Sequence, residues 1–162
     1  MQKPFNTVSA ISLSHYILSN VPSNQLKLQK LVYYSEGWHL AYFECSLIPE
    51  DFEAWVHGPV VRPMWDHYKK TGHNMLIDLH LKQEYSDKIR AYINQVLHPE
   101  QIELIHDVIK EYGDKSSYHL ETLSHSETPW REARNGYTQS ERSEAIISKE
   151  TMKRYYQSLF PK

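Results

Sequence analysis

The sequence predicts a mainly helical α+β fold: a compact helical domain around one central helix, with a small antiparallel β element. Apolar residues recur with the spacing of amphipathic helices along most of the chain. One long segment carries them on more than one face, which is typical of a helix with neighbours on several sides. Only five glycines occur in 162 residues, which argues against an all-β design. This length suits a single domain with its own core, over residues 1–162.

The N-terminal part of the chain predicts two helices. Thr7 is expected to cap the first, whose apolar stripe includes Val8, Ile11 and Leu18. The second is the central helix, expected from about Asn24 to Phe43. Its apolar positions point in several directions, so we expect other elements to pack around it.

The β element is expected after the central helix. Residues 47–48 and 52–56 are apolar and flank the turn sequence 49–51, which predicts a small hairpin or two short strands. Residues 58–59, Gly-Pro, should end it. Apolar and polar residues alternate over 77–81, which predicts a third short strand.

The remaining helices are predicted from their apolar stripes, prolines and caps. They are expected at Pro63, after Ser86, from Pro99 to Gly113, from Ser116 or Ser117 through Leu123, at Thr128–Trp130, and from Ser148 to about Phe160. A polar segment over residues 135–143 is expected to be a loop.

Composition excludes several classes of protein. The net charge of −2 gives no basic excess, so nucleic acid is not an expected partner. Cys45 is the only cysteine, which rules out an internal disulfide and a cysteine-based zinc site. The ten histidines are scattered singly, so we expect no metal and no cofactor. No signal peptide or spanning segment is evident, which predicts a cytoplasmic protein without a membrane partner.

Glu36 and His39 lie three residues apart on the central helix and should share a face. They could form a general acid–base pair or bind a metal, but we favour structural hydrogen bonds because no third ligand follows. Lys30, on the same helix, could be a functional lysine buried against aromatic residues. We favour an ordinary solvated lysine. Gly37 indicates close approach of another element, for which the turn at residues 58–59 is our candidate.

Two turn sequences carry further polar residues. His57-Gly58-Pro59 could begin an anion site with Arg62, although we favour a rigid corner. Ser124 to Trp130 contains His125, Glu127 and serines, the residue types of a nucleophilic site. No nucleophile elbow accompanies them, so we favour a cap, with Pro129 in a first helical turn and Trp130 anchored in the core.

Two blocks of the sequence, which contain the residues just discussed, resemble the signature of the Panacea domain, the SocA-like antitoxin family, which includes phage-associated GepA-like proteins. The first block runs from Leu28-Gln29-Lys30-Leu31 through Gly37-Trp38-His39-Leu40-Ala41 to Glu53-Ala54-Trp55 and Gly58-Pro59-Val60-Val61. The second is similar to the family's Thr-His-x-x-x-Pro-Trp element, with Ser124 in place of the threonine and with Ala133-Arg134 after it. The likeness covers about residues 7–160.

This resemblance implies a bacterial antitoxin that neutralises a cognate protein toxin, encoded nearby, by direct binding. The alternatives are a proteolytic adaptor that delivers a toxin to a cytoplasmic protease, or a hydrolase that uses histidine and glutamate residues of the two blocks. We expect no enzymatic activity, and a homo-oligomer is left open. The candidate motif and partner-binding residues are Lys30, Tyr34, Trp38, His39, Trp55, His57, Pro59, His125, Trp130 and Arg134.

Overall fold

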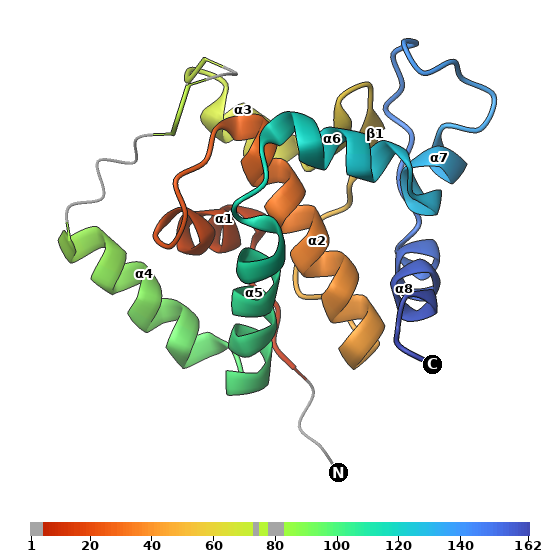
Figure 1. Cartoon of the computed structure of the whole chain (residues 1–162). Coiled ribbons are helices and arrows are strands. Elements are labelled where there is room, and N and C mark those ends of the chain that lie inside the picture. Colours follow the sequence, from red (N-terminus) through yellow and green to blue (C-terminus); the bar gives the residue numbers. More distant parts are fainter. Residues whose placement is uncertain (1–4, 73–74, 78–82) are drawn as a thin grey trace.

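The computed structural model describes residues 5–72, 75–77 and 83–162 of the chain (Figure 1). Over these residues the chain forms eight helices and one two-stranded antiparallel sheet, which confirms the predicted fold class. The elements are α1 (Ala10–Leu18), α2 (Gln25–Phe43), β1 (Glu53–Trp55), β2 (Gly58–Val60), α3 (Arg62–Tyr68), α4 (Gln83–Val96), α5 (Pro99–Tyr112), α6 (Ser117–His125), α7 (Thr128–Ala133) and α8 (Lys149–Ser158). None of these helices combines the length and the apolar character that crossing a bilayer requires.

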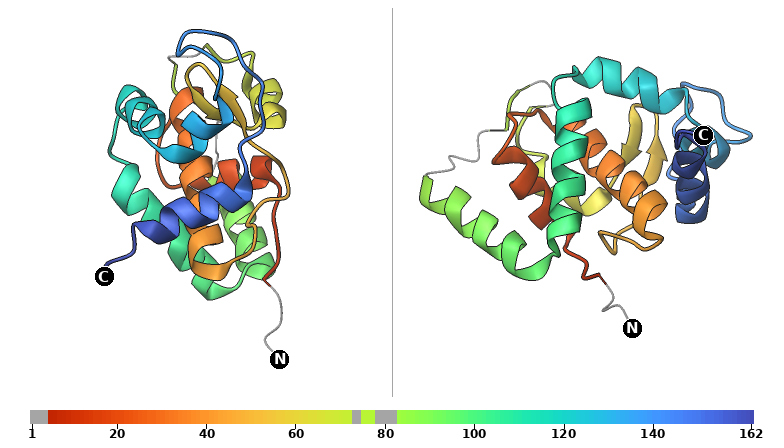
Figure 2. Two further views of the ribbon diagram at one scale, coloured as in Figure 1. Left: turned by 90° about the vertical axis from the view of Figure 1, so that its right-hand side faces the viewer. Right: turned by 60° about the horizontal axis from the view of Figure 1, so that its bottom comes forward.

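The central helix α2 organises the molecule. It begins where Asn24 caps it, with the side-chain oxygen of Asn24 accepting a hydrogen bond from the amide of Lys27 at 2.9 Å. It ends at Glu44, which adopts a left-handed conformation with φ 57°. Helices α1, α5, α6 and α8 pack around it, as the views in Figure 2 illustrate. Nearly every residue of α2 from Leu28 to Ala41 is therefore buried, as its many-sided apolar pattern predicted.

The first helix begins later than predicted. Its cap is Ser9, whose hydroxyl accepts from the amide of Ser12 at 3.0 Å, whereas Thr7 is exposed and lies outside the helix. The carboxylate of Glu50 also accepts a hydrogen bond from the amide of Ala10, at 3.1 Å. A negative charge at this position suits the positive end of the helix dipole.

The hairpin has different strands from those predicted. Ala54 pairs with Pro59 and Trp55 with Gly58, so the segment expected to end the β element is its second strand. Leu47 lies in no strand. Its amide donates to the side chain of Glu36 at 2.6 Å and its carbonyl accepts from Val8, so its backbone needs no strand partner.

The other edge of β1 is also covered. The amide of Ala54 donates to the carbonyl of Ala145 at 2.8 Å, and the amide of Ile147 donates to the carbonyl of Phe52 at 2.8 Å. Residues 145–147 thus run beside β1 just before α8. The third strand predicted over residues 77–81 falls largely outside the described residues, because 78–82 are not among them.

The later helices follow their predicted signals. Pro63 and Pro99 lie in the first turns of α3 and α5. Ser116 and Ser148 cap α6 and α8 through hydrogen bonds to the backbone. Helix α4 begins at Gln83, earlier than the start predicted after Ser86. The loop predicted over residues 135–143 connects α7 toward α8.

Candidate functional site

The turn of the hairpin lies directly on Lys30 of α2. Gly58 has φ +107°, and a Cβ atom there would lie 2.5 Å from Cε of Lys30 and 3.0 Å from the hydroxyl oxygen of Ser124. Position 58 therefore needs glycine both for its backbone conformation and for space. We call the surroundings of this contact the hairpin corner: Lys30, Trp55, His57, Gly58, Pro59, Ser124, His125, Trp130 and Arg134.

Lys30 corrects a prediction from the sequence. It was expected to be solvated, but only 1% of it is exposed. Its Nζ atom has one long hydrogen bond, 3.5 Å to the carbonyl of Leu26. Burial lowers the pKa of Lys30 to about 8, against a smaller opposing effect of Glu121. The hairpin turn at Gly58 packs directly against the side chain of this lysine and covers it.

Helix α7 anchors the hairpin from the other side. Trp130 is buried, as predicted, and its indole nitrogen donates to the carbonyl of Trp55 at 2.8 Å. Arg134 is also buried and donates to the carbonyl of Ala54 at 2.7 Å. The guanidinium lies 4.9 Å from the centre of the Trp130 ring, a cation–π contact. These contacts fix the position of β1 relative to α7.

The two histidines of the corner have different surroundings. His57 is exposed, and its Nδ1 lies 2.7 Å from the carboxylate of Glu121. His125 stacks on Trp130 with ring centres 4.0 Å apart, and burial lowers its pKa. The hydroxyl of Ser124 donates to the backbone carbonyl of Glu121 rather than to a histidine. The nucleophile–base hydrogen bond of a serine hydrolase is therefore not formed here.

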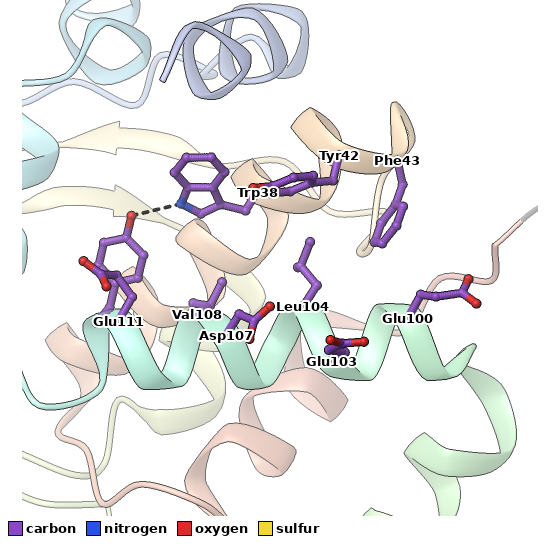
Figure 3. Close-up of a pocket in the computed structure, with 10 residues that line it drawn as sticks. Trp38, Tyr42, Phe43, Glu100, Glu103, Leu104, Asp107, Val108 and Glu111 are labelled. Carbon is purple, nitrogen blue, oxygen red and sulfur yellow. Dashed lines mark hydrogen bonds between the residues drawn. The ribbon is translucent and has the colours of Figure 1, made fainter. Parts of the chain in front are cut away.

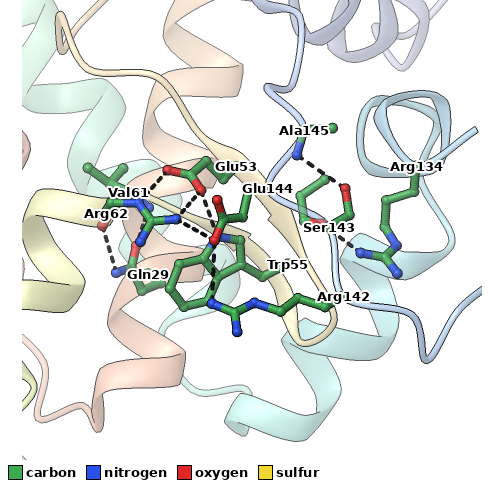
Figure 4. A network of polar contacts seen from close by, with 11 residues as sticks. Gln29, Glu53, Trp55, Val61, Arg62, Arg134, Arg142, Ser143, Glu144 and Ala145 are labelled. Carbon is green, nitrogen blue, oxygen red and sulfur yellow. Dashed lines mark hydrogen bonds and ion pairs between the residues drawn. The ribbon is translucent and has the colours of Figure 1, made fainter. Parts of the chain in front are cut away.

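Arg62 does not serve the anion site considered for the corner. Its guanidinium binds both carboxylate oxygens of Glu53, at 3.0 and 2.8 Å, and reaches Glu144 at 3.0 Å (Figure 4). Two carboxylates thus already neutralise this arginine. Gln29 completes the network from α2, exchanging two hydrogen bonds with the backbone of Val61.

A second group of residues lies deeper, and we call it the tyrosine–carboxyl cluster: Tyr34, Tyr112, Glu127 and Tyr156. One carboxylate oxygen of Glu127 accepts hydrogen bonds from Tyr34 at 2.8 Å and Tyr156 at 2.9 Å. Tyr34 stacks on Tyr112 with ring centres 4.2 Å apart. Burial raises the pKa of Glu127 to about 7, although both hydroxyl donors oppose the shift.

The same cluster explains Gly37 in a way the sequence did not. A Cβ atom at Gly37 would lie 2.6 Å from the ring of Tyr156, so α8 packs here and not the hairpin turn. Glu127 occupies the position directly before α7, where the sequence predicted a capping residue. Its side chain makes no capping bond, because it points into the cluster instead.

Glu36 and His39 are both buried but make separate contacts. Glu36 forms an ion pair with Lys149 of α8 at 2.7 Å. The Nδ1 atom of His39 donates to the carbonyl of Cys45 at 2.7 Å, and its Nε2 accepts from Gln101 at 3.0 Å. Burial lowers the pKa of His39 to about 4, so the ring is neutral at pH 7. This arrangement agrees with the structural role favoured from the sequence.

A groove of about 600 Å³ runs between α2 and α5 (Figure 3). We call it the α2–α5 groove. Its lining residues are Trp38, Tyr42, Phe43, Glu100, Glu103, Leu104, Asp107, Val108, Glu111 and Tyr112. Aromatic side chains come from α2, and apolar and acidic side chains come from α5. The indole nitrogen of Trp38 donates to the hydroxyl of Tyr112 at 2.9 Å, which joins the groove to the tyrosine–carboxyl cluster.

The structure divides the ten candidate residues among four places. The hairpin corner brings together Lys30, Trp55, His57, Pro59, His125, Trp130 and Arg134. Tyr34 belongs to the tyrosine–carboxyl cluster, Trp38 to the groove, and His39 to the contacts near the N-terminal segment. The acidic residues of α5 were missed, although their spacing was visible in the sequence. Over residues 5–72, 75–77 and 83–162, no three His, Cys, Asp or Glu side chains are arranged to hold a metal ion.

Comparisons with known proteins find a matching family model and a relative of known name. A family model described as antitoxin SocA-like, Panacea domain, matches residues 28–131. The antitoxin SocA of Caulobacter vibrioides (strain NA1000 / CB15N) is 28% identical over 118 residues, which are 72% of this chain and 63% of that protein. The chain therefore spans less than two thirds of this relative's length. No solved structure matches the chain.

Proposed function

The chain belongs to the SocA-like antitoxin family with the Panacea domain, and on that premise we propose that it neutralises a cognate protein toxin by binding it directly. The observation that carries the proposal is the extent of the family match. Residues 28–131 run from within α2 to within α7, and so include the hairpin and both walls of the α2–α5 groove.

The surface chemistry supports a binding role. Aromatic residues are favoured in protein interfaces, and the chain has twelve tyrosines and four tryptophans. Tyr42, on the central helix, is 58% exposed. The polar residues of the hairpin corner, by contrast, are mostly engaged in bonds that hold the fold. The toxin and this protein would meet in the bacterial cytoplasm.

Co-expression with the product of the adjacent gene tests the proposal. That product should arrest growth when it is expressed alone. Growth should recover when this protein is present, and the two should co-purify through gel filtration. A harmless neighbouring product that does not co-purify would count against the antitoxin role.

The lifetime of the toxin distinguishes masking from delivery to a protease. Direct masking leaves the toxin's half-life unchanged or longer while growth recovers. A proteolytic adaptor shortens that half-life, and the shortening disappears in a strain without the protease. Pulse-chase measurement of the adjacent product, with and without this protein, separates the two mechanisms.

A further inference from the structure

Four carboxylates line one side of the α2–α5 groove. Glu100, Glu103, Asp107 and Glu111 follow one another at spacings of three and four residues, so they form one row along α5. All four are exposed, and none forms an ion pair within the described part of the chain. Other surface carboxylates do find partners, such as Glu84 with Lys88 and Glu150 with Lys153.

The row is more than an ordinary solvated helix face, because an apolar surface lies beside it. Tyr42 is 58% exposed, and its ring is in contact with those of Trp38 and Phe160. Leu104 and Val108 lie between the aromatic wall and the carboxylates, as Figure 3 shows. No lysine or arginine lines the groove. The whole chain has a net charge of only −2, so this row is a local concentration of negative charge.

A hollow beside the hairpin has no such character. It has a volume of about 580 Å³, lies beside the hairpin, and has Arg142 and Glu144 in its lining. Glu144 is already bound to Arg62 and lies 3.4 Å from Arg142. Opposite charges are thus neutralised within that hollow, whereas the α2–α5 groove leaves its charges of one sign unmatched.

We infer that the α2–α5 groove docks a basic amphipathic helix of the protein toxin. The inference rests on the proposed function and adds the chemistry of the partner's segment. The row from Glu100 to Glu111 spans roughly 16 Å at 1.5 Å per residue, about three turns of a helix. A helix laid in this groove places apolar side chains against Trp38 and Tyr42 and places lysine or arginine residues along the carboxylates. Complementary charge of this kind speeds association and selects the partner.

Two variants with equal changes in charge test the inference. Glu103→Lys/Asp107→Lys reverses the middle of the row. Asp51→Lys/Asp66→Lys makes the same change at exposed residues that do not line the groove. Both variants are first compared with the wild type by circular dichroism, so that loss of folding is recognised. A third variant, Tyr42→Ala, removes the exposed aromatic ring, and Tyr118→Ala is its control.

The first probe is the product of the adjacent gene. We expect the groove reversal to weaken its binding about tenfold or more at low salt, and the control reversal to change it less than about twofold. Tyr42→Ala should weaken binding more than Tyr118→Ala does. Capture by the wild type and equal capture by the groove variants would overturn the docking inference while the antitoxin role stands. A product that the wild type neither captures nor neutralises contradicts the antitoxin role itself.

The second probe is independent of any toxin. It is a synthetic helix of about 18 residues with leucine on one face and lysine on the other, beside a version with glutamate in place of lysine. The lysine peptide should bind the wild type, and the groove reversal should weaken that binding about tenfold or more. Equal binding of both peptides, or equal binding of the lysine peptide to the wild type and the groove reversal, overturns the inference.

Discussion

The burial of Lys30 lowers the stability of the fold. Its ammonium group is buried beside Gly58 with a single long hydrogen bond, and a buried charge without a close partner is unfavourable. The pKa of Lys30 falls from 10.5 to about 8 for this reason. The cost is fully present below pH 8, where the folded protein carries the charge, and it disappears between pH 8 and 10.5.

Lys30→Met should therefore stabilise the protein at pH 7, by on the order of 3 kcal/mol at most. Methionine has a similar length and carries no charge into the interior. Urea denaturation at pH 7 and at pH 10 measures the effect, and the gain should be smaller at pH 10. Lys27→Met, one turn earlier on α2, is the matched control. A variant that is less stable than the wild type at pH 7 would indicate that the amine makes a favourable contact in the interior.

Glu127 gives the protein a dependence on pH in the opposite sense. Its pKa in the folded state, about 7, lies above the ordinary 4.5. The neutral carboxyl is thus favoured by folding. Its stabilising contribution is complete below pH 4.5 and is lost as pH rises through 7.

Glu127→Gln should remove this dependence, because the amide has the shape of the protonated acid and its oxygen still accepts from Tyr34 and Tyr156. The free energy of unfolding of the wild type should fall relative to the variant by on the order of 3 kcal/mol between pH 4.5 and 8. Glu84→Gln, an exposed glutamate of α4, should run parallel to the wild type. Parallel curves for wild type and Glu127→Gln would mean that Glu127 is already ionised at pH 5.

At this scale the sequence predicted where special residues lie but not which side chains they meet. Gly37 was identified as a place of close approach, and Gly58 as part of a rigid corner. Their partners, Tyr156 and Lys30, could not be assigned, because the first pair joins residues more than a hundred positions apart in sequence. A lysine on a helix is ordinarily solvated, so its burial could be learned only from the packing of neighbouring elements.

Among the elements, α7 is short but fixes the position of β1. It has six residues, yet Trp130 within it and Arg134 directly after it hold the backbone of β1. Arg134 also donates to the carbonyl of Thr138 at 2.8 Å and to that of Glu141, and so holds the loop after α7. One guanidinium therefore joins a strand, a helix and a loop.

Arg134→Met should leave these carbonyl groups without donors and cost about 2–4 kcal/mol of stability. The loop over residues 135–143 should become more sensitive to proteolysis, with amide exchange there faster than in α2. Arg131→Met, which changes an exposed arginine of α7, is the control. If proteolysis and amide exchange of this loop are unchanged while the free energy of unfolding falls, Arg134 stabilises the protein through its bond to β1 alone.

The β element was predicted in kind and not in register. The sequence offered apolar runs at residues 47–48 and 52–56, and pairing them was reasonable from pattern alone. The actual partner of β1 begins at Gly58 because the backbone of Leu47 is bound by Glu36 and Val8. Helices were predicted more accurately because their caps and stripes are local signals.

On the scale of the whole molecule, α8 closes the fold against α2. The ion pair between Glu36 and Lys149 is buried on the glutamate side. Lys149 also donates to the carbonyl of Ile48 at 2.9 Å. The N-terminal end of α8 is thereby fixed to the segment that follows the central helix.

Lys149→Met should destabilise the protein by about 3–5 kcal/mol at pH 7, because it leaves a buried carboxylate unpaired. The double variant Glu36→Gln/Lys149→Met should recover a large part of that loss. Thermal and urea denaturation of the wild type, both single variants and the double variant complete the cycle. Strict additivity of the two single effects would exclude a coupling between α2 and α8 through this pair.

The sequence predicts the residues of the α2–α5 groove but not their arrangement in space. The acidic spacing of α5 is local and can be read directly, as can the aromatic residues of α2. That Tyr42 lies across from Asp107 depends on how two helices pack, which no local pattern specifies.

The family match ends at residue 131, before α8 begins. Yet α8 supplies Lys149 to Glu36 and Tyr156 to both Gly37 and Glu127. A chimera that grafts residues 28–131 onto another protein would therefore leave Glu36, Gly37 and Glu127 without the side chains of α8 that contact them. Under the proposed function, an exchange of toxin specificity between relatives should transplant α8 together with residues 28–131.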